Sequence, residues 1–108
     1  MKRLYTHRYP SCAYPQVYEA YMAVLSAPPF KRSPEGNPYA SIFLDIGMTF
    51  RYNINGGSAD IRFFNDEGST VVQVEYVIGQ LVGARTEAYN NLIVQNVEKQ
   101  LGVTAQKL

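Results

Sequence analysis

Apolar residues near the start of the chain recur at the spacing of an amphipathic helix. They lie at i, i+3, i+4, i+7, i+10 and i+11, which places them on one helical face. The members are Tyr14, Val17, Tyr18, Tyr21, Val24 and Leu25. Pro15 fits the first helical turn, where its missing N–H leaves no bond unmade. Pro28-Pro29 ends the helix, because the residue before a proline avoids the helical conformation.

A second segment with this spacing lies near the other end of the chain. Its stripe consists of Tyr89, Leu92, Ile93, Asn96, Val97 and Leu101. Thr86 is a suitable N-cap, and Gly102 stands where a left-handed C-cap belongs. The pattern predicts a helix over residues 86–101 whose single polar stripe residue, Asn96, points toward the sheet. Asn96 is then either a satisfied core amide or a polar group inside a ligand cavity.

Between these segments the period changes to two, which is typical of strands with one buried face. The alternation predicts strands over residues 40–46, 48–54, 59–63 and 71–78, and a short edge strand over residues 2–8. Gly47 separates the first two strands. The run Asn55-Gly56-Gly57 predicts a hairpin turn, because Asn and Gly accept a positive φ, and Asp66-Glu67-Gly68-Ser69 predicts a second turn.

A single domain over residues 1–108 accounts for all these elements, because a chain of 108 residues is too short for two stable cores. Strands joined by tight turns are antiparallel, and both helices need an apolar sheet face to cover. We therefore predict an α+β fold. It consists of an antiparallel sheet of about five strands, in the order β-α-β-β-β-β-α, packed against two helices on one side.

Composition adds an abundance of tyrosine, with nine Tyr and five Phe but no Trp. Tyr prefers positions where its ring packs and its hydroxyl stays wet, which favours a partly polar groove or an interface. A net charge of +1 is not typical of nucleic-acid binding. The single cysteine fits a reducing compartment, and we find no signal peptide and no apolar run of membrane-spanning length. We expect a soluble cytoplasmic protein that binds no nucleic acid.

Candidate catalytic residues are few. His7 and Cys12 are the only soft base and nucleophile, and no third group to orient them is evident. We interpret them as a surface histidine and a half-buried thiol. The carboxylates lack the spacing of a metal site, and the glycines precede a strand, whereas phosphate loops open a helix. The sequence therefore predicts no metal, no cofactor and no catalytic residues, and favours a protein that is not an enzyme.

Three segments carry a resemblance to a known class of domain. They are MTFRYNINGGSADIRFF, NDEGSTVVQVEY and TEAYNNLIVQNVEKQLG. Their order resembles small bacterial domains of the START/Bet v 1-like (helix-grip) class in a shortened form. The likeness covers roughly residues 40–102, and residues 1–30 in element order only. It implies a curved antiparallel sheet around a long C-terminal helix, with space between them for a sterol, lipid, polyketide or other apolar ligand.

Two functional hypotheses remain open. The first is a non-catalytic module that binds a small apolar or amphipathic molecule between the sheet and the C-terminal helix, gated by the proline-rich residues 28–39. The candidate ligand-binding residues are Tyr14, Tyr18, Tyr21, Phe50, Tyr52, Phe63, Tyr76, Tyr89 and Asn96. The second is an interaction module that acts through self-association, as a homodimer or larger homo-oligomer, or by docking a partner. An enclosed void above roughly 300 Å³ favours the first.

Overall fold

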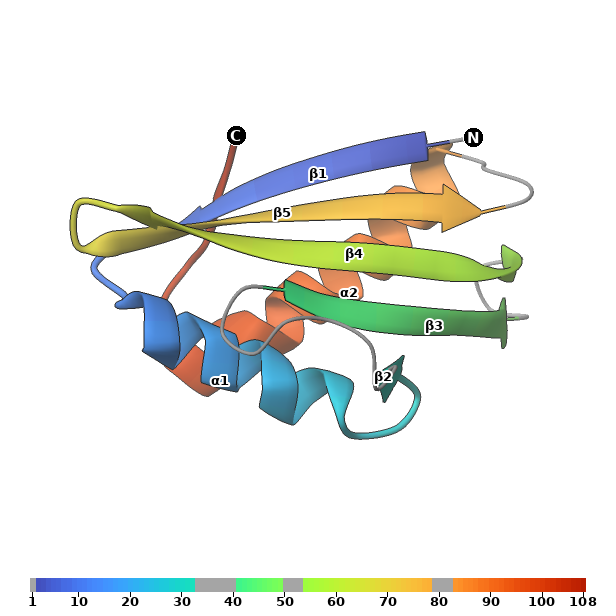
Figure 1. Ribbon diagram of the computed structural model, residues 1–108, viewed down its shortest axis with the longest axis horizontal. Helices are drawn as coiled ribbons and strands as arrows, with labels where there is room; N and C mark the ends of the chain where they lie inside the picture. Colours follow the sequence, from blue (N-terminus) through green and yellow to red (C-terminus); the bar gives the residue numbers. More distant parts are fainter. Residues whose placement is uncertain (1, 33–40, 50–53, 79–82) are drawn as a thin grey trace.

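The protein is described here by a computed structural model that covers residues 2–32, 41–49, 54–78 and 83–108. The elements are β1 (Lys2–Tyr9), α1 (Tyr14–Leu25), β2 (Lys31–Arg32), β3 (Ser41–Thr49), β4 (Ile54–Asp66), β5 (Ser69–Ile78), α2 (Gly83–Leu101) and β6 (Gln106–Lys107). The strands form one antiparallel sheet in the order β2-β3-β4-β5-β1-β6, in which four strands are long (Figure 1). The predicted α+β class, with two helices and an antiparallel sheet, is confirmed.

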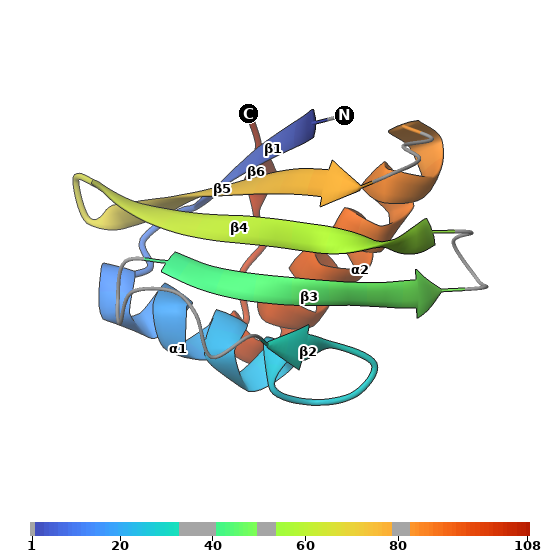
Figure 2. The same cartoon turned by 45° about the vertical axis from the view of Figure 1, so that its right-hand side comes forward.

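Both helices pack on the same face of the sheet. On β4, Phe63 and Ala59 are four residues apart and share a face, and Ala59 is the cross-strand partner of Tyr76 on β5. Phe63 contacts Tyr21 of α1, and Tyr76 contacts Tyr89 of α2. Figure 2, turned by 45° from Figure 1, shows α2 running behind β4 and β3, and α1 lying below β3. The predicted placement of both helices on one side is therefore confirmed.

The two helices follow the apolar stripes that predicted them. Val17, Tyr21 and Leu25 of α1 are fully buried, and α1 has a proline in its first turn. α2 begins at Gly83, three residues before the predicted start at Thr86. Gly102 has a φ of 71°, and its N–H donates to the Glu98 carbonyl at 2.8 Å. The predicted left-handed C-cap is therefore confirmed.

The two predicted turns have opposite outcomes. Asp66 pairs with Ser69, and the two residues between them have positive φ, 46° at Glu67 and 84° at Gly68, so this hairpin turn is confirmed. The turn predicted at Asn55-Gly56-Gly57 is wrong, because these residues lie inside β4. Gly57 pairs with a residue of β3 on one side and of β5 on the other. Hydrogen bonding to two neighbouring strands outweighs the turn preference of the local sequence.

The predicted break at Gly47 is also wrong. β3 runs without interruption from Ser41 to Thr49, and its pairing with β4 keeps one register, from Ser41 opposite Arg62 to Thr49 opposite Ile54. The segments 40–46 and 48–54, predicted as two strands, therefore do not form two separate long strands. The other strands of the sheet are the two-residue strands β2 and β6 at its outer edges.

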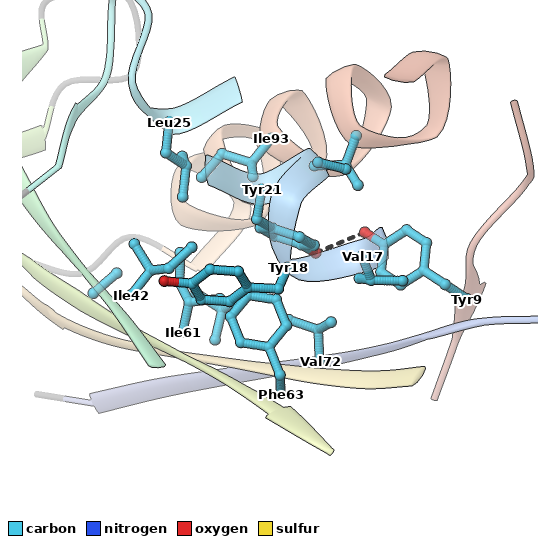
Figure 3. Packing of buried hydrophobic residues seen from close by; sticks show 14 of the residues in the cluster. Tyr9, Val17, Tyr18, Tyr21, Leu25, Ile42, Ile61, Phe63, Val72 and Ile93 are labelled. Carbon is cyan, nitrogen blue, oxygen red and sulfur yellow. Dashed lines mark hydrogen bonds between the residues drawn. The ribbon is translucent and has the colours of Figure 1, made fainter. Parts of the chain in front are cut away.

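The core lies between the inner face of the sheet and the two helices and is rich in tyrosine. Among the described residues, Tyr9, Tyr21 and Tyr76 are its largest fully buried side chains. Aliphatic residues from α1, β3, β4, β5 and α2 surround them, among them Ile61, Val72 and Ile93, as Figure 3 shows for one region of the core. Within the described residues, neither helix is long and apolar enough to cross a membrane.

Candidate functional site

Three of the predicted site residues from α1 converge on one residue of the sheet. The ring centroids of Tyr14, Tyr18 and Tyr21 lie 6.1, 5.3 and 5.3 Å from that of Phe63, all in edge-to-face geometry. We call these four residues the Phe63 cluster. Edge-to-face pairing is a favourable arrangement of aromatic rings. Figure 3 shows Tyr18 and Tyr21 packed against Phe63, so side chains fill this part of the space between α1 and the sheet.

A pair of buried hydroxyls joins the Phe63 cluster to β1. The hydroxyl oxygens of Tyr9 and Tyr21 are 2.6 Å apart, and both residues are fully buried (Figure 3). Burial raises the pKa of both hydroxyls, and the mutual hydrogen bond adds to the rise at Tyr21. Both groups therefore stay protonated near neutral pH and act as a structural link. The predicted edge strand ended at residue 8, although the alternation of Tyr5, His7 and Tyr9 continues to Tyr9.

A second aromatic group lies where α2 crosses the sheet. The ring of Tyr76 lies 5.8 Å from that of Tyr5 and 6.2 Å from that of Tyr89, and Phe30 lies 5.8 Å from Tyr89. We call these four residues the Tyr76 cluster. The structure thus brings together Tyr76 and Tyr89, as predicted, with Tyr5 and Phe30 as neighbours that the site prediction did not include.

Asn90 is the polar residue of this region, and its amide is only partly satisfied. Its side chain is 0% exposed, and its Oδ1 accepts a hydrogen bond of 2.7 Å from the Tyr76 hydroxyl. Its Nδ2 has no hydrogen-bond partner within the described part of the chain. A buried donor left without a partner costs about 1–3 kcal/mol. Burial also raises the pKa of Tyr76 well above its ordinary value, so its hydroxyl remains a donor to Asn90.

Asn90 was not among the predicted site residues, although its position on the helical stripe indicates that it is buried. Asn90, Ile93 and Val97 follow one another at helical spacing, and all three are fully buried. The polar stripe residue predicted from the sequence was Asn96 instead. Asn96 is half-buried, and its Nδ2 donates to the Leu92 carbonyl of its own helix at 2.9 Å.

Asn96 was predicted to face the sheet. It lines a surface groove between the two helices instead. The groove has a volume of about 330 Å³. Its lining residues are Ala23, Val24, Ala27, Pro28, Pro29, Phe30, Asn96, Lys99 and Gln100. We call it the helix groove. The first residues of the proline-rich segment 28–39 form one of its walls, while residues 33–40 lie outside the described part of the chain, as do Phe50 and Tyr52.

His7 and Cys12 differ from the sequence-based interpretation, because both are buried. Burial lowers the pKa of His7, and the nearby Lys107 lowers it further, so the imidazole is neutral at neutral pH. The Cys12 carbonyl accepts a hydrogen bond of 2.8 Å from the Thr70 hydroxyl. Within the described residues, no group of three or more His, Cys, Asp or Glu side chains is placed to hold a metal ion.

The described geometry is therefore that of two aromatic clusters, an incompletely satisfied amide and a groove between helices. Comparison with models of known protein families and with curated protein sequences finds no match to this chain.

Proposed function

We propose that this protein is a non-catalytic binding module that holds a small, mainly apolar molecule between α2 and the sheet, beside the Tyr76 cluster. The observation that carries the proposal is the Nδ2 of Asn90, a fully buried donor without a partner in the described part of the chain. Buried polar groups in proteins are nearly always hydrogen-bonded, so an unmet donor marks a place where a ligand atom can bind.

The surroundings indicate the chemistry of that ligand. Asn90 presents an N–H, so the ligand atom beside it is a hydrogen-bond acceptor such as a carbonyl or ether oxygen. The aromatic rings of Tyr76 and Tyr89 offer apolar contact to the rest of the molecule. Burying a charged group in such surroundings is costly, which favours a neutral ligand.

The test separates ligand binding from stability. In the double variant Asn90→Leu/Tyr76→Phe, both hydrogen-bonding partners become apolar at similar size, and such paired replacement is close to neutral for folding. We expect this variant to fold but to lose binding of a neutral ketone probe, acetophenone, measured by NMR titration and by native mass spectrometry. The matched control Tyr9→Phe/Tyr21→Phe removes the buried hydrogen bond between the Tyr9 and Tyr21 hydroxyls, and it should still bind acetophenone. Equal binding by the wild type and the Asn90 variant, or none by either, would refute the proposal.

The second candidate function is an interaction module that uses the other face of the sheet. Three large apolar side chains are exposed on it, Leu4 at 56%, Phe64 at 44% and Val77 at 43%. Leu4 and Val77 lie two register positions apart on paired strands, whereas Phe64 lies opposite Val71, nearer the other end of β5. Exposed apolar side chains favour contact with another protein surface. Native mass spectrometry of the wild type tests self-association directly, because a dimer appears as its own mass. The triple variant Leu4→Ser/Phe64→Ser/Val77→Ser should lack this dimer.

A further inference from the structure

The helix groove offers apolar contact on one side and polar groups on the other. Val24, Ala27 and the two prolines come from the end of α1 and the segment after it, and Phe30 closes the inner end of this wall. Asn96, Lys99 and Gln100 come from the last two turns of α2. A volume of about 330 Å³ is near the lower limit for a small-molecule pocket. The groove is therefore sized for one ring with a short chain.

Lys99 gives the groove its charge. Among the described residues that line the groove, Lys99 is the only one with an ionisable side chain. The neighbouring depression of about 410 Å³ also includes Lys99, but Glu98 lines it as well and offsets the positive charge. The helix groove is therefore the more favourable of the two for an anion.

The end of α1 adds an opposing influence, because the last carbonyls of a helix carry partial negative charge. Backbone donors already engage part of this charge. The N–H of Ser26 donates to the Met22 carbonyl at 3.0 Å, and the N–H of Ala27 donates to the Val24 carbonyl at 3.4 Å. The N–H of Phe30 in turn donates to the Ala27 carbonyl at 3.1 Å. The ammonium of Lys99 thus remains the leading charge at the groove.

We propose that the helix groove binds a small carboxylate with an aryl or branched-alkyl body. The apolar body lies against Val24, Pro29 and Phe30, and the carboxylate accepts hydrogen bonds from Lys99 Nζ. The Asn96 amide, which uses one N–H on the Leu92 carbonyl, orients the ligand with its remaining N–H. This site shares Phe30 with the Tyr76 cluster but uses neither Asn90 nor Tyr76, so it does not depend on the site proposed at Asn90.

The probe for this site is 3-phenylpropanoate, compared with its neutral amide and with 3-phenylpropylammonium. Backbone amide signals are followed by two-dimensional NMR during titration of the whole chain. We expect the carboxylate to shift the signals of residues 23–27 and 96–100 and to bind more tightly than the amide, while the ammonium binds most weakly. Equal binding of the three probes, shifts confined to other residues, or no binding would overturn the proposal.

Variants of the groove residues distinguish the contribution of charge to carboxylate binding from that of groove shape. Lys99→Gln keeps most of the side-chain length and should weaken carboxylate binding about fivefold without changing amide binding, and Lys99→Arg should restore it. The control Arg62→Gln removes an exposed positive charge, which is paired with Asp60, from the face of the sheet opposite the helices and should have no effect. Ala23→Phe fills the groove and should abolish binding of both probes.

Two outcomes among the variants contradict the proposal directly. If Lys99→Gln binds the carboxylate as the wild type does, the charge of Lys99 has no role. If Ala23→Phe binds normally while folded, the groove is not the site. The double variant Asn90→Leu/Tyr76→Phe should bind 3-phenylpropanoate normally, so that failure of this proposal and failure of the one at Asn90 can be told apart.

Discussion

The buried polar groups of this core are satisfied to different degrees. Tyr9 and Tyr21 share one short hydrogen bond between their hydroxyls. Asn90 accepts a hydrogen bond from Tyr76, but its own N–H has no partner among the described residues. The first pair is hydrogen-bonded within the protein, whereas the side-chain NH2 of Asn90 still has unused donor capacity among the described residues. This difference in hydrogen bonding separates a structural polar pair from a candidate binding residue.

Replacing Tyr21 by Phe tests the structural pair. The change removes one hydroxyl and leaves the buried Tyr9 hydroxyl without its partner. We expect the free energy of unfolding to fall by about 1–3 kcal/mol, measured by urea denaturation. Tyr9→Phe/Tyr21→Phe removes both hydroxyls and should be more stable than Tyr21→Phe alone. A double variant that is no more stable would show that the hydrogen bond is not the source of the loss.

Alkaline pH should destabilise the fold through the same residues. Burial raises the pKa of Tyr9, Tyr21 and Tyr76 above the ordinary value of 10.0, so the folded state keeps these protons where the unfolded state loses them. Their contribution to stability is complete below about pH 10 and is lost as the pH rises further. We expect urea midpoints that stay level up to about pH 9 and fall above about pH 10. The decline should be shallower for Tyr9→Phe/Tyr21→Phe, and parallel curves would contradict this assignment.

At the scale of the element, local sequence predicted structure well wherever neighbours in sequence decide it. The apolar stripe and prolines predicted α1, and Gly102 predicted the end of α2. The turn between β4 and β5 was predicted because Gly68 accepts the positive φ that this turn needs. Two predictions failed, the strand break at Gly47 and the turn at Asn55-Gly56-Gly57. Both concern residues whose conformation depends on pairing between β3 and β4.

The two central residues of the β4–β5 turn should respond in opposite directions to substitution. Gly68 has a φ of 84° and open space around it, so Gly68→Ala should destabilise by about 1 kcal/mol through backbone strain alone. Glu67 has a φ of 46°, which Asn tolerates better, so Glu67→Asn should be stabilising by a few tenths of a kcal/mol. Thermal unfolding of both variants checks this, and a loss of stability in Glu67→Asn would argue against the assigned turn.

At the scale of the whole molecule, α1 and α2 both cover one face of the sheet, and no helix of the described residues covers the other. Phe63 and Phe64 are adjacent in sequence but lie on opposite faces. Phe63 belongs to the Phe63 cluster and is buried, whereas Phe64 is exposed. The alternation over residues 59–63 predicted a strand with one buried face, but the three tyrosines packed on Phe63 became evident only from the placement of α1.

This pair of neighbours gives a matched test of the two faces. Phe63→Ala opens a cavity beneath α1 and should lower the free energy of unfolding by about 3–5 kcal/mol. Phe64→Ala changes an exposed side chain and should stay within about 0.5 kcal/mol of the wild type. Urea denaturation followed by intrinsic tyrosine fluorescence measures the stability of both variants. Similar losses in the two variants would contradict the described orientation of β4.

The sequence by itself determined the α+β class, both helices, the hairpin turn at Glu67-Gly68 and the inward side of β4 and β5. Each of these depends on the period of apolar residues or on the φ preference of one or two residues. Tertiary structure alone decided that Gly57 is held in a strand, that β1 pairs with β5, and that the Asn90 amide lies buried against Tyr76. These features need contacts between residues distant in sequence, and no local pattern specifies which distant partner a strand or an amide will meet.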